Sequence, residues 1–310
     1  MRDRLVADVV SLLEDGEFEV SDTCNIRPKS FDLVARRGSL VLFVKVLVNV
    51  DGLDRRSADE LKLLSHHLDA SALVVGRKTR DGELEDGVLY LRRGIPALNP
   101  ATAYDQFVEG VPPFAYMSRG GLYVNVDGDV LEDRRRENGM SLGQVAQELG
   151  VSRRSVSKYE DGMDASIDVA LRLEEVFDAD VVLPVDVFPG PVEYDEPEPE
   201  LDEDERTAYT VFRRTGFEVH HTTGAPFRAV VDRDRDIPDA LLTGSGGTST
   251  ARKRARLMSS IGRVTETESI YLMESHSDDT LEDTVVIEYD ELREFDSAEE
   301  LYEVYRERRG

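Results

Sequence analysis

A short basic segment stands out in a strongly acidic chain. The 310 residues include 38 basic and 64 acidic side chains, for a net charge of −26, yet residues 149–159 carry three bases and no acid. A helix here that buries Val156 and Tyr159 turns the polar side chains outward. Those outward residues are Arg153, Arg154, Ser157 and Lys158. Cations on an exposed helix face are what contact with DNA phosphates and base edges requires.

The residues before this segment predict another helix and a tight turn. Ser141 followed by Gln144 is a capping box, and Gly150 suits a left-handed helix end. Ser152 can then cap the next helix. Apolar side chains recur at the spacing of one buried helical face, at Leu142, Val145, Ala146 and Leu149. A further helix over 167–177 can close a small helical bundle.

This arrangement resembles the Cro/CI (XRE-type) helix-turn-helix family. The family's Ala, Gly, Val-Ser and Tyr-Glu-x-Gly positions are present as Ala146, Gly150, Val151-Ser152 and Tyr159-Glu160-Asp161-Gly162. The resemblance implies that the second helix of the pair lies in the major groove of double-stranded DNA. It assigns DNA contacts to Ser141, Gln144, Ser152, Arg153, Arg154, Ser155, Ser157 and Lys158. Because Leu142 stands where the family often has Gln, the usual contact from that position is not expected.

The basic residues are almost all arginine, since only 6 of the 38 are lysine. Excess carboxylates and scarce lysine are typical of organisms with molar internal salt, where the Debye length is only about 3 Å. Under this halophilic interpretation, the overall negative charge does not repel DNA. Binding to DNA then depends on local clusters of positive charge. Under the alternative interpretation, at ordinary salt, a charge of −26 would repel nucleic acid.

The sequence argues against membrane and secreted proteins. No apolar stretch approaches the ~20 residues that cross a bilayer, because the longest one, 40–44, ends at Lys45. The first residues lack the apolar stretch of a signal peptide. Cys24 is the single cysteine, which excludes an intrachain disulfide and a cysteine-only metal site. We therefore expect a cytoplasmic protein with no membrane partner.

Residues 1–115 mix helical and strand patterns and predict an α/β domain. Helices are expected at 3–14, 57–68 and 99–108, and strands at 18–20, 31–35, 40–48, 72–76 and 88–91. The order resembles the restriction-endonuclease-like fold, in which an Asp on one strand and a Glu-x-Lys on the next bind a divalent metal and activate water. Asp32 and Lys45 occupy two of these positions, but Phe43 stands where the second carboxylate belongs. We expect a degenerate scaffold with no catalytic residues, no metal and no cofactor.

The last third of the chain looks like a distant copy of the first. Residues 211–219 resemble 12–20, and residues 281–285 resemble 84–88, at a nearly constant offset of 197 to 199 positions. Residues 207–310 are therefore expected to form a second α/β domain with the same strand order. The predicted fold class is α/β plus all-α, with two repeated α/β domains flanking a helical domain.

Between the copies, the sequence predicts a DNA-binding domain and a linker. Residues 120–188 are expected to begin with a β-hairpin over 122–130 that turns at Asp127-Gly128, and then to be helical to about residue 180. Residues 189–206 form an acidic linker that is expected to stay solvated and extended.

Other patterns in the sequence add no catalytic site. When the copies are aligned, Asp32 falls on Ala229 and Lys45 falls near Leu242. The Gly-rich residues 243–250 are expected to form a flexible loop before a basic helix, because they lack the Gly-Lys-Ser/Thr ending of a nucleotide-binding loop. That helix is a minor candidate for auxiliary phosphate contact.

Two adjacent histidine pairs, His66-His67 and His220-His221, are the remaining candidates for metal ligands. Neighbouring side chains diverge on a helix or strand, and neither pair has Cys or carboxylate partners at ligand spacing. We therefore expect these histidines to be structural or exposed, with no metal bound.

These patterns together predict a regulator rather than an enzyme. The layout of a helix-turn-helix between two α/β regions resembles a group of archaeal HTH-type transcriptional regulators. We expect a sequence-specific transcription regulator that binds double-stranded DNA as a homodimer. Two alternatives remain open: a protein-binding adaptor or antitoxin, and a metal-dependent nuclease. The nuclease needs a second carboxylate beside Asp32, for example from Glu14 or Glu17.

Overall fold

The computed structural model describes residues 1–118, 120–188, 190, 193–233, 240–276 and 278–309. The first α/β region forms as predicted, with one additional strand. Its helices are α1 (Arg2–Asp15), α2 (Arg55–His67) and α3 (Pro100–Tyr104), and α3 continues as a π-helical turn (Asp105–Glu109). Its strands are β1 (Glu19–Val20), β2 (Leu33–Arg37), β3 (Leu40–Asn49), β4 (Ser71–Lys78), β5 (Val88–Arg92) and β6 (Ile95–Leu98). Strand β6, which pairs with both β4 and β5, is not among the predicted strands.

The second α/β region has the same topology as the first. Its helices are α8 (Glu203–Arg214), α9 (Thr248–Thr265), α10 (Tyr289–Glu294) and α11 (Ala298–Arg309). Its strands are β11 (Glu218–His221), β12 (Ala229–Asp232), β13 (Leu241–Ser245), β14 (Glu268–Met273), β15 (Thr280–Leu281) and β16 (Thr284–Glu288). The strand order β11-β12-β13-β14-β16-β15 repeats the order β1-β2-β3-β4-β6-β5. Each pair of strands also runs in the same relative sense as its counterpart in the first region.

The alignment of the two copies is corrected by one residue at the start of the second strand. The amide of Asp32 donates to the carbonyl of Val44, and in the second copy the amide of Arg228 donates to the carbonyl of Thr243. Arg228, not Ala229, therefore corresponds to Asp32. A shift of one residue matters because successive strand side chains point to opposite faces.

The two α/β regions pack against each other through one continuous hydrophobic core. Side chains from α2 and α9 contribute to it, together with one face of each sheet. Buried Glu60 on α2 ties the regions together by accepting hydrogen bonds from the amides of Thr223 and Gly224, at 2.7 and 2.9 Å. Separate cores on the outer faces pack α1 and α3 on the first sheet, and α8, α10 and α11 on the second.

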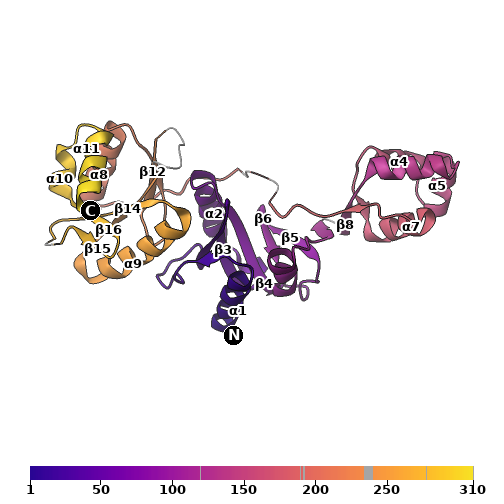
Figure 1. Cartoon of the computed structure of the whole chain (residues 1–310), viewed down its shortest axis with the longest axis horizontal. Coiled ribbons are helices and arrows are strands. Elements are labelled where there is room, and N and C mark those ends of the chain that lie inside the picture. Colours follow the sequence, from indigo (N-terminus) through magenta and orange to yellow (C-terminus); the bar gives the residue numbers. More distant parts are fainter. Residues whose placement is uncertain (119, 189, 191–192, 234–239, 277, 310) are drawn as a thin grey trace.

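The helical module projects away from the two α/β regions (Figure 1). It contains α4 (Gly128–Glu137), α5 (Leu142–Leu149), α6 (Arg153–Glu160) and α7 (Ile167–Phe177), with strands β7 (Ala115–Ser118), β8 (Gly121–Val126), β9 (Ala165–Ser166) and β10 (Val182–Leu183). The parallel pairing of β5 with β7 joins it to the first sheet. The segment is therefore not purely helical, because β9 and β10 both pair with β8.

The predicted hairpin turn at Asp127-Gly128 is wrong. Asp127 instead caps α4 by accepting a hydrogen bond from the amide of Val130, at 3.1 Å. Gly128 is the first residue of α4 and packs on the end of α6, where a Cβ atom would lie 2.2 Å from the carbonyl oxygen of Glu160. Asp127 therefore caps a helix and Gly128 allows close packing. Both roles favour the same residue types, Asp and Gly, as a hairpin turn does.

The acidic segment between the regions is docked rather than freely solvated. The Tyr194 hydroxyl lies 2.9 Å from a ring nitrogen of His67, and Asp195 pairs with Arg55. The last predicted linker residues belong to α8, which begins with a capping box of Asp202 and Glu205. Residues 189, 191 and 192 lie outside the described residues.

In the described residues, no helix combines the length and apolar character of a transmembrane span.

Candidate nucleic-acid interface

The predicted helix-turn-helix is present with its caps. The Ser141 hydroxyl accepts from the amide of Gln144, and the Gln144 side chain accepts from the amide of Ser141 at 2.8 Å. Gly150 ends α5 with a φ of 68°, in the left-handed region that favours glycine. Ser152 caps α6 by accepting from the amide of Ser155 at 3.0 Å. These caps fix the turn between α5 and α6, and so fix the direction in which α6 points.

A small core holds α6 against the rest of the module. Val156 and Tyr159 on the inner face of α6 are buried, as predicted. They belong to the core that includes Val145, Ala146, Leu149, Leu131, Ala170, Leu173 and Phe177. The apolar side of α6 packs against this core, so its polar side faces outward.

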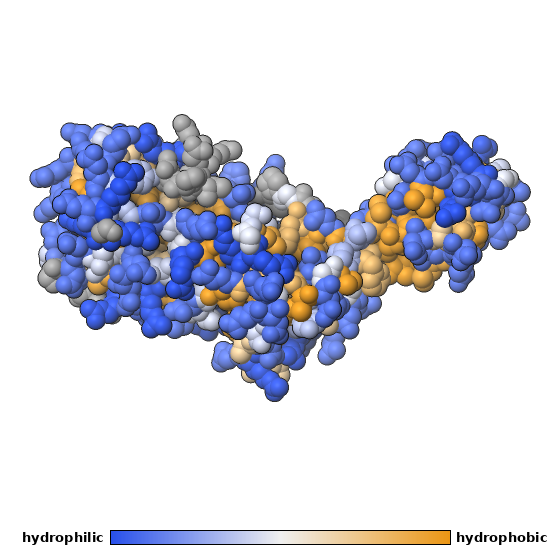
Figure 2. Space-filling model, in the orientation of Figure 1, coloured by the Kyte–Doolittle hydropathy of each residue, from blue (hydrophilic) through white to orange (hydrophobic). Residues whose placement is uncertain are grey.

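Six of the eight predicted DNA-contact residues are exposed: Ser141, Gln144, Ser152, Arg153, Arg154 and Lys158. Ser155 and Ser157 are half-buried, and the Ser155 hydroxyl lies 2.9 Å from that of Ser152. Figure 2 shows hydrophilic residues over the outer end of the module, and apolar residues on its side nearer the rest of the chain.

The cations of α6 are not neutralised by neighbouring acids. Within the described part of the module, the arginine ion pairs involve Arg134, Arg135 and Arg136 of α4, and none involves the bases of α6. Glu160, the acid at the end of α6, is held in a two-bonded pair by Arg135, with nitrogen–oxygen distances of 2.5 and 3.0 Å. This pair also pins α4 to α6. The exposed face of α6 can therefore accept a polyanion without first breaking an ion pair.

The nuclease-like centre of the first α/β region has its acid blocked by cations. One oxygen of fully buried Asp32 lies 2.6 Å from both Arg2 Nη2 and Lys29 Nζ. Its other oxygen accepts from the amide of Val46 at 2.7 Å. Burial raises the pKa of Asp32, but the hydrogen bonds and cations outweigh burial and hold this pKa below its ordinary value. Asp32 is thus a charged acceptor that is already saturated, with little capacity for a metal ion.

The other predicted positions of the centre also serve packing. Phe43 is fully buried and makes an edge-on contact with Phe31, with ring centroids 5.1 Å apart. Lys45 is buried and donates to the carbonyl of Lys29 at 2.5 Å. Burial lowers the pKa of the Lys45 ammonium. The cavity beside it, of about 410 Å³, is lined by the bases Arg2, Arg27, Lys29, Lys45 and Arg56, with Asp54 as its acid.

The second copy reverses the charges at the corresponding place. In the first copy an acid, Asp32, precedes the second strand and pairs with a base, Arg2. In the second copy the base Arg228 precedes the second strand, and it donates to both oxygens of the acid Glu205, each at 2.9 Å. Glu205 also accepts from the Ser245 hydroxyl at 2.5 Å. A base therefore occupies the place of the nuclease aspartate, and the described residues of this copy hold no acid–lysine pair at that place.

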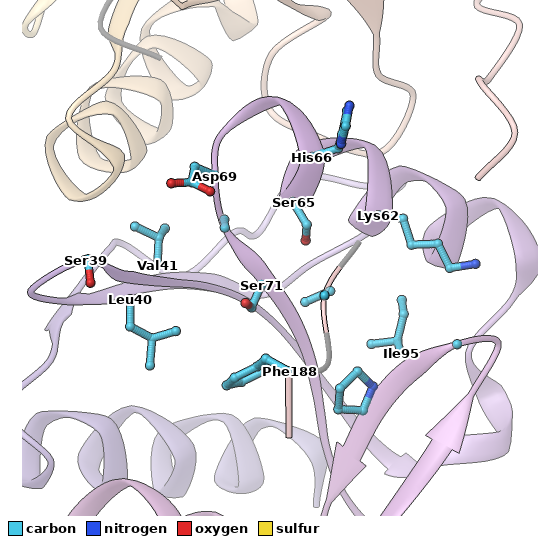
Figure 3. A pocket seen from close by; sticks show the side chains of 15 residues that line it. Ser39, Leu40, Val41, Lys62, Ser65, His66, Asp69, Ser71, Ile95 and Phe188 are labelled. Carbon is cyan, nitrogen blue, oxygen red and sulfur yellow. The ribbon is translucent and has the colours of Figure 1, made fainter. Parts of the chain in front are cut away.

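A cavity of about 570 Å³ opens at the other end of the first sheet (Figure 3). It lies at the beginnings of β3 and β4, beside the end of α2, and its lining includes Leu40, Lys62, His66, Asp69 and Phe188. Ligands of α/β sheets bind outside the carboxyl ends of the parallel strands, and this cavity is at their amino ends. Its polar side chains do not converge on one point in Figure 3, so it does not resemble a reaction centre.

The Gly-rich segment is more ordered than predicted. Residues 243–245 complete β13, and α9 begins at Thr248. Two bases of α9 pair with the first α/β region: Arg256 with Asp22 at 3.0 Å, and Arg263 with Glu19 at 3.1 Å. These pairs give the basic helix a role in docking the two regions.

The expectation that the histidines lack ligand-type partners is wrong. His67 of α2 and His220 of β11 stack with ring centroids 3.5 Å apart, and buried Asp232 lies beside both rings. His67 comes from the first α/β region, and His220 and Asp232 come from adjacent strands of the second, so linear spacing does not predict the contact of His67 with the other two.

Two family models match parts of the chain. Residues 2–113 match the PD-(D/E)XK superfamily domain, and residues 131–182 match a helix-turn-helix. The predicted fold class, a nuclease-like α/β scaffold with a helix-turn-helix, is confirmed. No solved structure matches the chain.

Full-length archaeal relatives carry one common name. A protein of Natronomonas pharaonis named "Putative HTH-type transcriptional regulatory protein" is 50% identical over 312 residues, which cover 99% of this chain and 98% of the relative. A protein of the same description from Halobacterium salinarum is 48% identical over 313 residues, with coverage of 99% and 98%. Another from Methanococcoides burtonii is 44% identical over 318 residues, with coverage of 99% and 97%.

Proposed function

The chain belongs to this family of archaeal HTH-type transcriptional regulatory proteins, and on that premise we propose that it is a sequence-specific regulator that reads double-stranded DNA with α6. The observation that carries the proposal is the exposed face of α6, where Arg153, Arg154 and Lys158 project without acidic partners among the described residues. Arginine can donate two hydrogen bonds to one guanine, and lysine can contact phosphate. The protein acts in the cytoplasm, where its DNA target lies.

The division of the chain gives each part a separate task. Residues 120–188 contact DNA, while residues 1–115 and 207–310 form a paired body joined by the acidic segment 189–206. This division is supported by the projection of the helical module away from the two α/β regions (Figure 1). The body then serves assembly or signal reception rather than base recognition.

We expect the DNA-bound form to be a homodimer. Three large apolar side chains on the module remain exposed, and such side chains mark contact surfaces: Met163, Leu171 and Leu183. Dimers of this helix-turn-helix class place their reading helices in half-sites one helical turn apart, about 34 Å. A DNA footprint should therefore show two protected half-sites with inverted sequence. Protection of a single half-site in the footprint, together with a monomeric protein–DNA complex in sedimentation, would contradict the homodimer.

The nuclease-like region is proposed to be a scaffold without catalysis. Asp32 is saturated by two cations and an amide, and Phe43 replaces the second carboxylate. Metal-dependent hydrolysis needs oxygen ligands that are free to hold the ion and an activated water.

The protein is accordingly expected to leave DNA intact in Mg²⁺ or Mn²⁺. The measurement is a cleavage assay on supercoiled and branched DNA, from low to molar salt. Asp32→Ala serves as the test variant, and Asp3→Ala, which changes an exposed acid on α1, serves as its control. Nicking by the wild type and by Asp3→Ala that disappears in Asp32→Ala would show that the nuclease centre is active.

A further inference from the structure

Three side chains with ligand atoms share one face of the second sheet. Glu218 and His220 are two residues apart on β11, so they point to the same side. Glu218 is the direct cross-strand partner of Asp232 on β12. The antiparallel register thus brings two carboxylates and an imidazole together on adjacent strands.

The separations within this trio do not suit direct hydrogen bonds. The Nε2 atom of His220 lies 3.6 Å from Oδ1 of Asp232 and 3.7 Å from Oε2 of Glu218. Protein hydrogen bonds between nitrogen and oxygen are about 2.7–3.2 Å long. Both His220 Nε2 and Asp232 Oδ1 are buried and have no hydrogen-bond partner among the described residues. Two buried polar atoms left unsatisfied and facing each other are costly unless something binds between them.

The same separations suit a shared metal ion. Zinc binds His nitrogen and carboxylate oxygen at about 2.0–2.2 Å in tetrahedral geometry, which puts neighbouring ligand atoms about 3.4 Å apart. The observed distances of 3.6 and 3.7 Å need a shift of only a few tenths of an ångström. We propose that His220 Nε2, Asp232 Oδ1 and Glu218 Oε2 bind one divalent transition metal ion, with zinc as the best fit to this set of ligands.

The surrounding side chains orient the ligands as metal sites require. The Nδ1 atom of His220 faces Oε1 of Glu196 at 3.4 Å, so Nε2 is the ring nitrogen directed at Asp232 and Glu218. The Nδ1 atom of His67 lies 3.0 Å from Oδ2 of Asp232, so it holds the carboxylate oxygen that the metal does not need. The other nitrogen of His67 lies 2.9 Å from the Tyr194 hydroxyl.

The charges of the cluster favour a bound cation. Glu196, Glu218 and Asp232 have only histidine partners among the ion pairs of the described residues, and no lysine or arginine. A divalent cation at His220 Nε2 would place positive charge directly beside Asp232 and Glu218. The exposed Glu218 leaves an entry route from solvent.

The position of the site gives the ion a structural role. His67 comes from α2 of the first α/β region, Glu196 from the acidic segment, and the three ligands from the second α/β region. An ion at His220 therefore fixes the face on which α2 and the acidic segment dock. Metal loading would set the rigidity of the paired body that carries the DNA-reading module.

Zinc titration of the full chain, stripped of metal with a chelator and dialysed, tests the site. Calorimetry should show saturable binding of one ion per chain, and zinc should raise the melting temperature. Glu218→Gln is the informative variant, because its exposed side chain can be changed with little risk to folding. It should weaken zinc binding at least tenfold and remove the rise in melting temperature. Glu274→Gln, at another exposed acid, should bind as the wild type does.

Two further variants separate ligands from supporting residues. Asp232→Asn should weaken binding at least as much as Glu218→Gln, and His67→Phe should weaken it about 10- to 100-fold through lost orientation. Absence of saturable zinc binding would overturn the proposal and leave an ion-free cluster of His220 with its acids. Stoichiometric binding that is unchanged in Glu218→Gln would also overturn it, since the ion would then sit elsewhere.

Discussion

Replacing Arg153 and Arg154 together with alanine is expected to reduce the affinity for the specific DNA site at least about 30-fold. Each two-bonded contact between arginine and a base is worth about 1–3 kcal/mol, and 1.4 kcal/mol corresponds to a tenfold change in affinity. Both side chains are exposed, so their removal takes nothing from the core. The measurement is a binding titration on the selected site at fixed salt, because affinities for DNA depend strongly on ionic strength.

The matched control removes two positive charges from exposed helical surfaces of the α/β regions. Arg4→Ala/Arg306→Ala makes the same change in net charge on α1 and α11, for which no DNA contact is proposed. We expect it to keep specific binding within a few-fold of the wild type. If both double variants lose the same affinity, the effect is one of overall charge and α6 does not read bases.

Gly128→Ala is expected to destabilise the helical module by about 3 kcal/mol or more. Its Cβ would lie 2.2 Å from the carbonyl oxygen of Glu160 and 2.9 Å from that of Tyr159, and these backbone atoms cannot turn aside as a side chain can. The displaced end of α6 would also lose its packing on α4. Hydrogen exchange of the α4–α6 amides measures the loss, and specific DNA binding should fall with it.

Gly143→Ala is the control for a glycine without such contact. In α5 its Cβ would have the Ser141 hydroxyl oxygen as its nearest neighbour, at 3.8 Å. Alanine in an exposed helix should stabilise the module by about 0.5–1 kcal/mol. Equal protection of the α4–α6 amides in Gly128→Ala and in wild type would show that α4 does not pack on α6 as described.

Helix ends that depend on residues close together in the sequence could be predicted. Ser141 with Gln144 gave the start of α5, and Gly150 gave its end, because a cap involves residues only three or four positions apart. Asp127-Gly128 shows the limit of the same reasoning. Its composition suits a turn or a cap, and only the contact with Glu160 on another helix decides between them.

The chemistry of the two buried charge clusters depends on contacts between distant residues. Asp32 can be singled out from the sequence, but its ion pair with Arg2 depends on the start of α1 lying beside the residue that precedes β2. The contact of His67 with His220 depends on the docking of two α/β regions and has no linear spacing, whereas Glu218-x-His220 on one strand is the local signal that could have indicated this cluster. The repeat could be recognised from its constant offset, but its register was wrong by one residue until the backbone hydrogen bonds fixed it.

Genome-wide occupancy mapping in the native cell tests most directly whether α6 makes this protein a sequence-specific regulator. Tagged wild-type chain and the Arg153→Ala/Arg154→Ala variant would be expressed at equal levels, and the DNA recovered with each would be sequenced. Discrete sites that share one inverted motif should appear with the wild type and disappear with the variant. Uniform recovery of DNA with the wild type, or the same sites with both chains, would contradict recognition of DNA by α6.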